Sequence, residues 1–335
     1  MTWKEYQIDD TDIAEWVSWG GIVKDSVMEN KDHSFFSVIQ YEPNLRAACS
    51  YMKNFSFKNG WNIWSEKQNR NGDFQYFLVV SWNPDYDKSD NANNTLSGQS
   101  IHVKEASSFF EKEVESILKE MSTVISCRVI MGQEFLDFLT FTLSLGEHSV
   151  SMPDTTLFLD ALLTQDLKVS FLDNGITINE KNIMILTLPS IPEMPIMDIL
   201  YRAFSRFSYR HVQRMLLFGK DEAKEDLEKY ISKWCGGRKS LKDIITDKLL
   251  SNLNGYYSGA FIFLIESDRH EELMEYCQMT LNELEIPYLF EEYNLKDVWW
   301  GSLPGMFRAN ITAPIVGIRH LEDLLAQKEG DLIYV

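Results

Sequence analysis

Short alternations of apolar and polar residues predict strand pairs in the first half of the chain. Trp61–Gln68 and Phe74–Trp82 flank the polar turn Asn69–Asp73, which is the pattern of a hairpin. Ile22–Met28 and Ser34–Tyr41 predict a second strand pair around another polar turn.

Apolar residues recur at helical spacing in other segments, which predicts helices between the strands. Lys104–Met121 carries charged residues between its apolar positions, whereas Gln133–Leu145 is largely apolar. Thr11–Trp19 begins with two residues that can cap a helix, and Pro195–Arg206 has proline in its first turn. Further helices are predicted over Asn44–Asn54, Thr155–Leu163, Asp221–Trp234, Leu241–Leu250 and Arg269–Leu284.

The second half of the chain repeats the alternation of strands and helices. Asp173-Asn174-Gly175 joins the strand-like runs Lys168–Leu172 and Gly175–Ile178, and Asn-Gly supplies the left-handed residues that a tight hairpin needs. Further strands are predicted over Thr123–Ile130, Asn182–Leu188, Ala260–Ile265 and Pro287–Glu291. This order predicts an α+β (mixed α/β) fold in which helices pack on sheets, and it fits neither a helical bundle nor a β-sandwich.

Two features indicate a division of the chain into domains. A length of 335 residues favours two domains over one. Gly146–Pro153 contains Gly, Ser and Pro between two well-patterned regions, so a boundary is expected there. We therefore expect two layered sheet-and-helix subdomains, over residues 1–150 and 151–335. The polar, Asn-rich segment Asn83–Gly98 is expected to be a mobile loop.

Composition and charge limit the classes of function. The hydrophobic fraction of 44% and the charged fraction of 24% are typical of a globular protein. The net charge of -18 disfavours nucleic-acid binding, because an acidic chain repels the phosphate backbone. Met1–Asp12 lacks the apolar core of a signal peptide, and no apolar run reaches the ~20 residues of a spanning helix. A cytoplasmic chain that meets a membrane only peripherally is expected.

The sequence lacks the motifs of nucleotide and metal chemistry. A phosphate-binding loop needs G-x-x-x-x-G-K-[ST], but Arg214 precedes Gly219-Lys220 at the first glycine position, and Asp221 replaces the hydroxyl residue. The aspartates of the polar loop lack the glycine and glutamate of a calcium loop. The four cysteines are too far apart in sequence for a zinc or redox pair, so reduced thiols are expected. We expect no catalytic, cofactor-binding or metal-binding residues in this chain.

One segment is basic within an acidic chain. Arg202, Arg206, Arg210 and Arg214 recur every four residues, and no acidic residue lies between Ile199 and Gly219. If a strand begins near Phe207, Arg210 and Arg214 share one face of it with Val212. These arginines either pair with carboxylates of the same chain or bind an acidic partner. We expect Arg210 and Arg214 to be structural, and Arg202 and Arg206 to bind a partner.

Four of the nine tryptophans lie near the two ends of the chain: Trp16, Trp19, Trp299 and Trp300. Most tryptophans are core residues that keep one polar edge in contact with water. The alternative is that these four bind a partner. We include them with Arg202 and Arg206 as candidate partner-binding residues.

Several strings in a fixed order carry more specific information. Ala14–Trp19 leads into Glu29–Phe35, in which His33 stands at the position of a turn glycine. Tyr209–Arg214 is followed by Lys233-Trp234 and then by Arg238–Leu241. Leu303-Pro304-Gly305 precedes Ala309-Asn310 and Leu321–Leu325 near the end of the chain.

Together these strings resemble the TrbE/CagE-type family of conjugal-transfer and type IV secretion ATPases, from about Trp16 to Leu325. They are similar to the family's opening hairpin, its arginine-bearing strand and helix, and the L-P-G stretch that closes this region. Thr312 and Ala326 replace a family arginine and proline, so no role is carried over to them. By the resemblance, Trp234, Pro304 and Gly305 are candidate structural residues.

The resemblance implies that this chain is the N-terminal docking and assembly region of such an ATPase. Its expected partners are inner-membrane subunits of a secretion complex and neighbouring protomers. ATP and magnesium are expected only for a catalytic domain that would follow Val335, so the chain alone would not be an enzyme. Two alternatives stay open: an enzyme that uses carboxylates such as Glu266 and Asp268, and a nucleic-acid-binding module that uses Arg202–Arg214.

Overall fold

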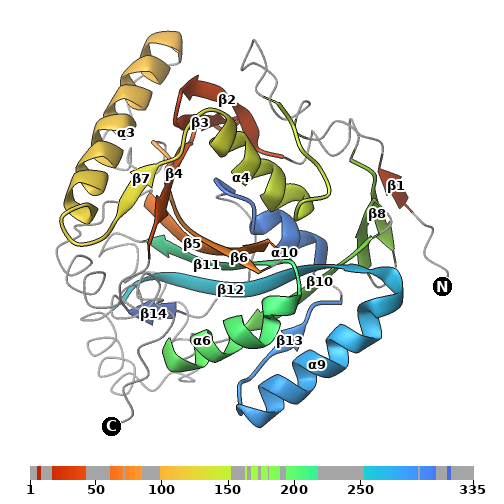
Figure 1. The fold of residues 1–335 in the computed structure, drawn as a ribbon. Helices are drawn as coiled ribbons and strands as arrows, with labels where there is room; N and C mark the ends of the chain where they lie inside the picture. Colours follow the sequence, from red (N-terminus) through yellow and green to blue (C-terminus); the bar gives the residue numbers. More distant parts are fainter. Residues whose placement is uncertain are drawn as a thin grey trace, which may run out of the picture.

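The computed structural model of the chain describes residues 6–8, 17–42, 61–70, 72–84, 99–151, 163, 167–172, 175–179, 181–188, 194–217, 253–292, 295–306 and 315–317. Its described strands form one sheet of 14 strands, and every described pair is antiparallel (Figure 1). The order is β1-β8-β9-β10-β12-β11-β5-β6-β4-β3-β2, with β13 beside β10, β14 beside β12 and β7 beside β4.

The strands are β1 (Tyr6–Ile8), β2 (Trp19–Lys24), β3 (Val27–Asn30), β4 (Phe35–Tyr41), β5 (Trp61–Arg70), β6 (Asp73–Trp82), β7 (Cys127–Val129), β8 (Val169–Leu172), β9 (Gly175–Ile178), β10 (Lys181–Leu188), β11 (Tyr209–Leu217), β12 (Leu253–Glu266), β13 (Leu289–Phe290) and β14 (Ile315–Gly317). The helices are α3 (Gln99–Met121), α4 (Gln133–Ser144), α6 (Met194–Ala203), α9 (His270–Glu283) and α10 (Leu295–Gly301), with short 3-10 turns at Phe204–Arg206 and Ser267–Arg269. The predicted α+β class is confirmed.

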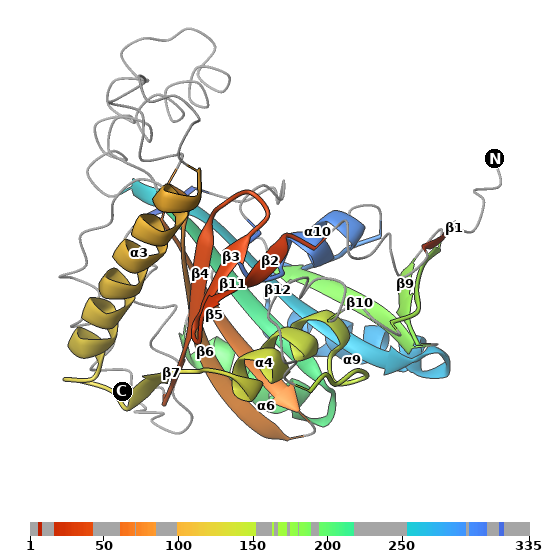
Figure 2. The ribbon, with the colours of Figure 1, turned by 90° about the horizontal axis from the view of Figure 1, so that it is seen from above.

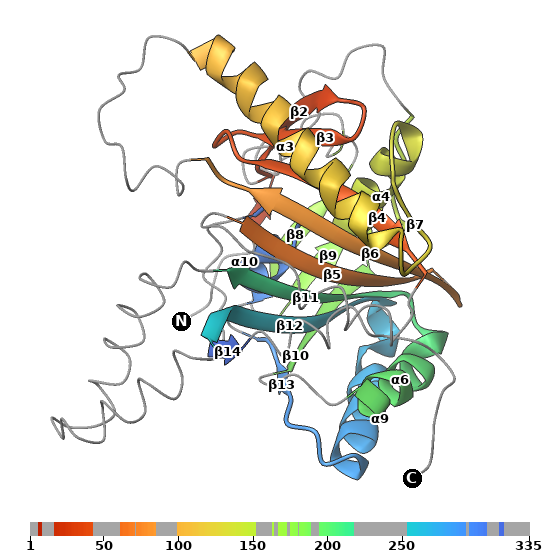
Figure 3. The same cartoon turned by 90° about the vertical axis from the view of Figure 1, so that its left-hand side faces the viewer.

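Helices cover both faces of the curved sheet. On the inner side, α4 and α10 pack in one apolar cluster with side chains from most of the strands (Figures 1 and 2). On the outer side, α3 packs on β3–β6, and α6 and α9 pack on β10–β12 (Figure 3). In β4, Phe36 and Val38 point to the inner cluster while Phe35 and Ile39 point to α3. This two-sided burial explains why the strands are apolar at successive positions rather than only at alternate ones.

The sheet is continuous across the boundary expected near residue 150. β11, from the second half of the chain, pairs with β5, from the first half, with Arg210 opposite Gln68 and Arg214 opposite Trp64. The inner cluster likewise takes residues from both halves. The described sheet therefore has no break that corresponds to two separate sheets, and the division at residue 150 stays a prediction about the chain as a whole.

Several predicted elements have different bounds in the structure. Trp19 begins β2 instead of ending a helix, because it pairs with Asn30 in the β2–β3 hairpin. The run Ile22–Met28 is divided by a turn at residues 25–26 into β2 and β3. The run Thr123–Ile130 contains a strand only over Cys127–Val129, since the preceding residues form the turn that ends α3. Apolar content alone did not reveal these turns.

The turn that joins β3 to β4 has a non-glycine residue in the left-handed region. His33 has a φ of 62°, and its Nδ1 lies 2.8 Å from Oε1 of Glu29. The Asp32 carboxylate accepts hydrogen bonds from the backbone N–H and the hydroxyl of Ser34, at 3.1 and 2.6 Å. Side-chain hydrogen bonds thus support a backbone conformation that costs a non-glycine residue free energy.

Some sequence predictions lie outside the described residues. These are the helices over 44–54, 221–234 and 241–250, most of the loop over 83–98, most of the helices over 11–19 and 155–163, and the candidate residues Trp16 and Trp234. Within the part of the chain that the structure describes, no helix is long and apolar enough to cross a membrane.

Candidate functional site

The middle of the sheet contains a run of buried polar side chains. Five successive residues of β5, Ser65–Asn69, are each 3% exposed or less. Because side chains alternate along a strand, this run places polar groups on both faces of the sheet. Buried polar groups need partners, and β11 and the helices on each face supply them.

On the inner face, Arg210 of β11 lies at the centre of the cluster and is fully buried. Its Nε and Nη2 donate to the two carboxylate oxygens of Glu66, at 3.2 and 2.7 Å. Nη1 donates to the carbonyl of Thr142 in α4 at 3.1 Å and to Ser302 Oγ at 3.0 Å, and Nη2 donates to the carbonyl of Ser302 at 2.8 Å. These five bonds match the five N–H donors of a guanidinium group. One side chain therefore links the sheet, α4 and the segment after α10.

On the outer face, Lys67 lies among aromatic rings beneath α6. Its Nζ is 3.6 Å from the ring centroid of Tyr201, and 4.4 and 4.6 Å from those of Phe74 and Tyr76. The Tyr201 hydroxyl lies 2.9 Å from Nδ1 of His211, whose ring stacks on Phe261 with centroids 4.1 Å apart. These contacts hold α6 against β5, β11 and β12.

His211 is held in its neutral form by this environment. Burial, together with the smaller effect of the positive charge on Lys67, lowers its pKa from the ordinary value near 6.5 to about 3. The unfolded chain therefore binds a proton on His211 between these two values, whereas the folded chain does not.

We expect the stabilising effect of a neutral His211 to be complete above pH 6.5 and to be lost progressively as the pH falls toward 3. Between pH 7 and 4.5, the free energy of unfolding should fall by about 2–3 kcal/mol more in the wild-type chain than in His211→Gln. Urea unfolding of both proteins at the two pH values measures this difference. Equal losses would show that His211 does not carry the effect.

The N-terminal hairpin and the segment after α10 meet on the inner face. Trp19 Nε1 donates to the carbonyl of Pro304 at 2.8 Å, and the Asn30 amide donates to the carbonyl of Gly305 at 3.0 Å. Trp299 and Trp300 stack on each other with centroids 4.5 Å apart in the same cluster. No pattern in the sequence indicated that the N-terminal hairpin and the Leu303-Pro304-Gly305 segment are neighbours.

Three of the four tryptophans named as candidate partner contacts are covered by the chain itself, and the fourth, Trp16, lies outside the described residues. Trp19 and Trp299 are 0% exposed and Trp300 is 4% exposed, so all three are core residues in this structure. Their apolar surface is covered by the chain itself, which is the commoner environment of tryptophan. Pro304 and Gly305 are buried, and their carbonyls accept the hydrogen bonds of Trp19 and Asn30.

The four arginines occupy two different environments. Arg210, Val212 and Arg214 share the inner face, as the strand alternation predicted, and the Arg214 guanidinium lies 5.0 Å from the Trp64 ring centroid. Arg202 is exposed on α6. Arg206 is half exposed; it lies 3.8 Å from the Glu272 carboxylate and 3.9 Å from the Tyr276 ring centroid. The partner of Arg210 is Glu66, not a carboxylate of the predicted helix over 221–234, which lies outside the described residues.

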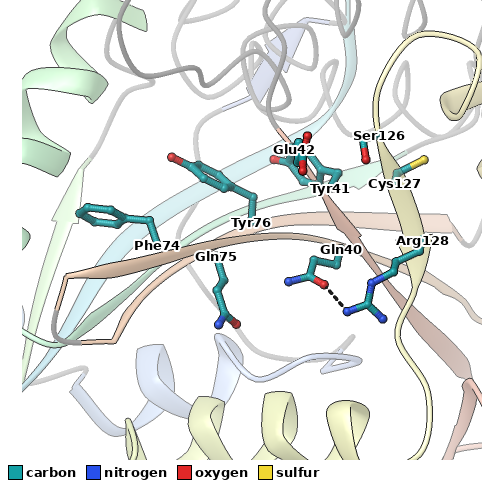
Figure 4. Close-up of a pocket in the computed structure, with 9 residues that line it drawn as sticks. All are labelled: Gln40, Tyr41, Glu42, Phe74, Gln75, Tyr76, Ser126, Cys127 and Arg128. Carbon is teal, nitrogen blue, oxygen red and sulfur yellow. Dashed lines mark hydrogen bonds between the residues drawn. The ribbon is translucent and has the colours of Figure 1, made fainter.

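A pocket of about 350 Å³ opens at another point of the sheet, where β4 ends beside β6 and β7 (Figure 4). Tyr41, Phe74 and Tyr76 line it together with Gln40, Gln75 and Arg128. Burial raises the pKa of Tyr41 to about 12, so its hydroxyl stays protonated near neutral pH. Arg128 donates to Gln40 at 2.7 Å and to Glu134 at 2.9 Å.

Two described thiols are affected by burial, and one candidate carboxylate lies beside a lysine. Burial raises the pKa of the Cys127 and Cys277 thiols, to about 12 for Cys277, so both are weak nucleophiles. Glu266, considered above as a catalytic carboxylate, lies 3.4 Å from Lys181. Among the described residues, no group of three His, Cys, Asp or Glu side chains could hold a metal ion.

Sequence reasoning missed four residues of the buried network: Glu66, Lys67, Tyr201 and Ser302. A signal was present for the first two, because the unusually polar run Ser-Glu-Lys-Gln-Asn directly follows Trp61–Trp64, in which three of the four residues are apolar. A strand that is polar on both faces is either at a sheet edge or in the middle of a polar network. The pairing of β5 with both β6 and β11 shows that it is the latter.

Comparisons with known proteins give distant relatives. No family model matches this chain. It is 21% identical over 309 residues to conjugal transfer protein TrbE of Rhizobium radiobacter, and the match covers 78% of this chain and 37% of the relative. It is 24% identical over 227 residues to the second portion of a probable conjugal transfer protein TrbE of Sinorhizobium fredii (strain NBRC 101917 / NGR234), where the match covers 59% of this chain and 33% of the relative. The chain thus spans about a third of the length of these curated relatives.

Proposed function

The chain is a relative of the TrbE-type conjugal transfer proteins, and from this relationship we propose that it is a docking and assembly region of a conjugal transfer, or type IV secretion, apparatus. One observation carries the proposal: the similarity to TrbE covers 78% of this chain. The match covers 37% of that relative, so the activity of a whole TrbE-type protein is not assigned to this chain. In this proposal the chain positions an ATPase domain and does not itself bind ATP or magnesium.

The fold supports an assembly role through its rigidity. The Arg210 network joins the sheet, α4 and the segment after α10, and the hydrogen bonds of Trp19 and Asn30 join that segment to the N-terminal hairpin. These contacts join described segments that are far apart in the chain, and a body braced in this way can hold one partner in a fixed position relative to another. Such a body suits contacts with inner-membrane subunits on one side and neighbouring protomers on another, at the cytoplasmic face of the inner membrane.

We assign the candidate partner contacts to Arg202 and Arg206 on α6 and the turn that follows it. Both are exposed at least in part, and they stand out on a chain with a net charge of -18. Cations on an acidic body select for an acidic surface of the partner and raise the rate of association.

The test is co-purification from cells that carry a conjugal transfer system of the relatives' kind. The tagged wild-type chain should retain inner-membrane subunits of that system. Arg202→Glu with Arg206→Glu should reduce the retained amount several-fold, whereas Lys168→Glu, a charge reversal at an exposed position just before β8, should leave it unchanged. Retention that is absent in the wild type would refute the assembly role, and equal retention by all variants would refute the assignment to these arginines.

We expect no ATP hydrolysis by the purified chain. Without a phosphate-binding loop, the triphosphate has no cradle of backbone N–H groups and magnesium has no hydroxyl ligand. Phosphate release should equal that of a blank at saturating ATP and magnesium. Turnover that co-elutes with the chain through gel filtration would contradict the non-catalytic role.

A further inference from the structure

The strands β4 and β6 diverge at one end of their ladder. Their pairing stops at Gln40 opposite Phe77, while β6 continues to pair with β5 as far as Asp73 opposite Arg70. On its other edge β4 pairs with β7, from Ile39 opposite Val129 to Tyr41 opposite Cys127, and the backbone N–H of Glu42 donates to the carbonyl of Ser126 at 2.9 Å. The pocket of about 350 Å³ lies where β4 no longer pairs with the start of β6.

The pocket has two chemically different sides (Figure 4). Phe74, Tyr76 and Tyr41 lie on one side of the strands, and their rings form an aromatic wall. Gln75, Gln40 and Arg128 lie on the other side and present amides and a guanidinium. An extended peptide has the same two-sided character, because its side chains point alternately to opposite faces. Among the described strands, Phe74 and Gln75 of β6 pair with β5 alone, so their other backbone edge can receive such a peptide.

Charge decides which chain could lie there. The Arg128 charge is balanced by Glu134, to which it donates at 2.9 Å. The Glu42 carboxylate in the lining opposes the charge of Lys67, whose Nζ lies 4.4 and 4.6 Å from the ring centroids of Phe74 and Tyr76. The whole chain carries a net charge of -18, so a second copy would be repelled. A basic partner is favoured by the same charge.

We propose that this pocket is a docking slot for an extended, basic segment of a partner protein, which adds to β6 at Phe74 and Gln75 as a short strand. Alternate side chains of the segment lie on the aromatic wall of Tyr41, Phe74 and Tyr76, and the intervening ones lie by Gln40 and Gln75. The slot extends the assembly role proposed above, on which its biological setting rests. It is distinct from the Arg202 and Arg206 surface.

The test uses the purified chain and a labelled synthetic peptide of roughly nine residues, a length that spans a short strand. The peptide alternates threonine with tyrosine and has lysine at each end. Two controls have the same core: one has glutamate at each end, and one has N-methyl groups on alternate backbone amides so that it cannot pair as a strand. The matched protein variants are Gln75→Lys in the slot and Gln278→Lys on the exposed face of α9.

Fluorescence anisotropy should show saturable binding of the lysine peptide and weaker binding of both control peptides. Gln75→Lys should weaken binding of the lysine peptide about fivefold, as expected for one added like charge, while Gln278→Lys should not. The proposal is overturned if the lysine peptide does not bind, if the N-methylated peptide binds equally, or if the two variants behave alike. This test uses no secretion component. A negative peptide result would therefore overturn the slot without affecting the assembly role, and a negative co-purification result would overturn the assembly role without affecting peptide binding.

Discussion

Replacing Arg210 by alanine is expected to lower the free energy of unfolding by about 3–5 kcal/mol, because it leaves the buried Glu66 carboxylate without its cation. The carbonyls of Thr142 and Ser302 also lose their donors, and each such buried group adds to the cost. Urea unfolding of the purified chain, followed by circular dichroism, measures the change.

Two further variants separate the buried charge from the loss of side-chain volume. Arg210→Met combined with Glu66→Leu removes both charges and fills the space, so its loss should be smaller than that of Arg210→Ala. Arg202→Ala removes an exposed arginine from α6 and should change stability by no more than about 0.5 kcal/mol. If Arg210→Ala were as mild as Arg202→Ala, the buried pair would not hold the sheet, α4 and the segment after α10 together.

Gly305→Ala is the second substitution with a large expected effect. Gly305 has a φ of 79°, and a Cβ at this position would lie 2.6 Å from an edge carbon of the Phe36 ring and 2.7 Å from the Asn30 amide nitrogen. The left-handed backbone costs alanine about 1 kcal/mol, and the overpacking adds about 1–3 kcal/mol. We therefore expect a total loss of roughly 2–4 kcal/mol in the free energy of unfolding.

Gly72→Ala is the matched control for the backbone alone. Gly72 has a φ of 97°, but nothing lies within 4 Å of the position that an alanine Cβ would take there. Its substitution should cost only about 1 kcal/mol, so the difference between the two variants measures the contact with Phe36 and Asn30. Gly305→Ala should also shift the indole N–H resonance of Trp19, which donates to the neighbouring Pro304 carbonyl. An equal loss in both variants with an unchanged Trp19 resonance would contradict the tight closure.

The candidate site was foreseen in part. The strand alternation of 210, 212 and 214 follows from backbone geometry, so the shared face of Arg210 and Arg214 could be predicted from the sequence. The identity of the Arg210 partner could not, because Glu66 lies 144 positions away in the chain. The contact of Tyr201 in α6 with Lys67 in β5 could not be predicted either, because it depends on which strands and helices become neighbours in the fold.

Local patterns were sufficient for the elements whose information is local. The β5–β6 and β8–β9 hairpins, the helices α3 and α4, and the α+β class follow from turn residues and from the period of apolar positions. The absence of a phosphate-binding loop and the excess of acidic residues are also properties of the sequence itself. These features depend on neighbours within a few residues, so the order of the side chains is enough to specify them.

Tertiary structure alone decided the strand order, the environment of the tryptophans and the position of the pocket. The sheet joins β11 to β5 and brings the Pro304 carbonyl to Trp19, and these contacts connect residues far apart in the chain. A tryptophan at an interface and a tryptophan in a core have the same sequence signal, because both bury a large apolar surface. Only the packing of α10 against the N-terminal hairpin shows that here the chain itself covers Trp19 and Trp299.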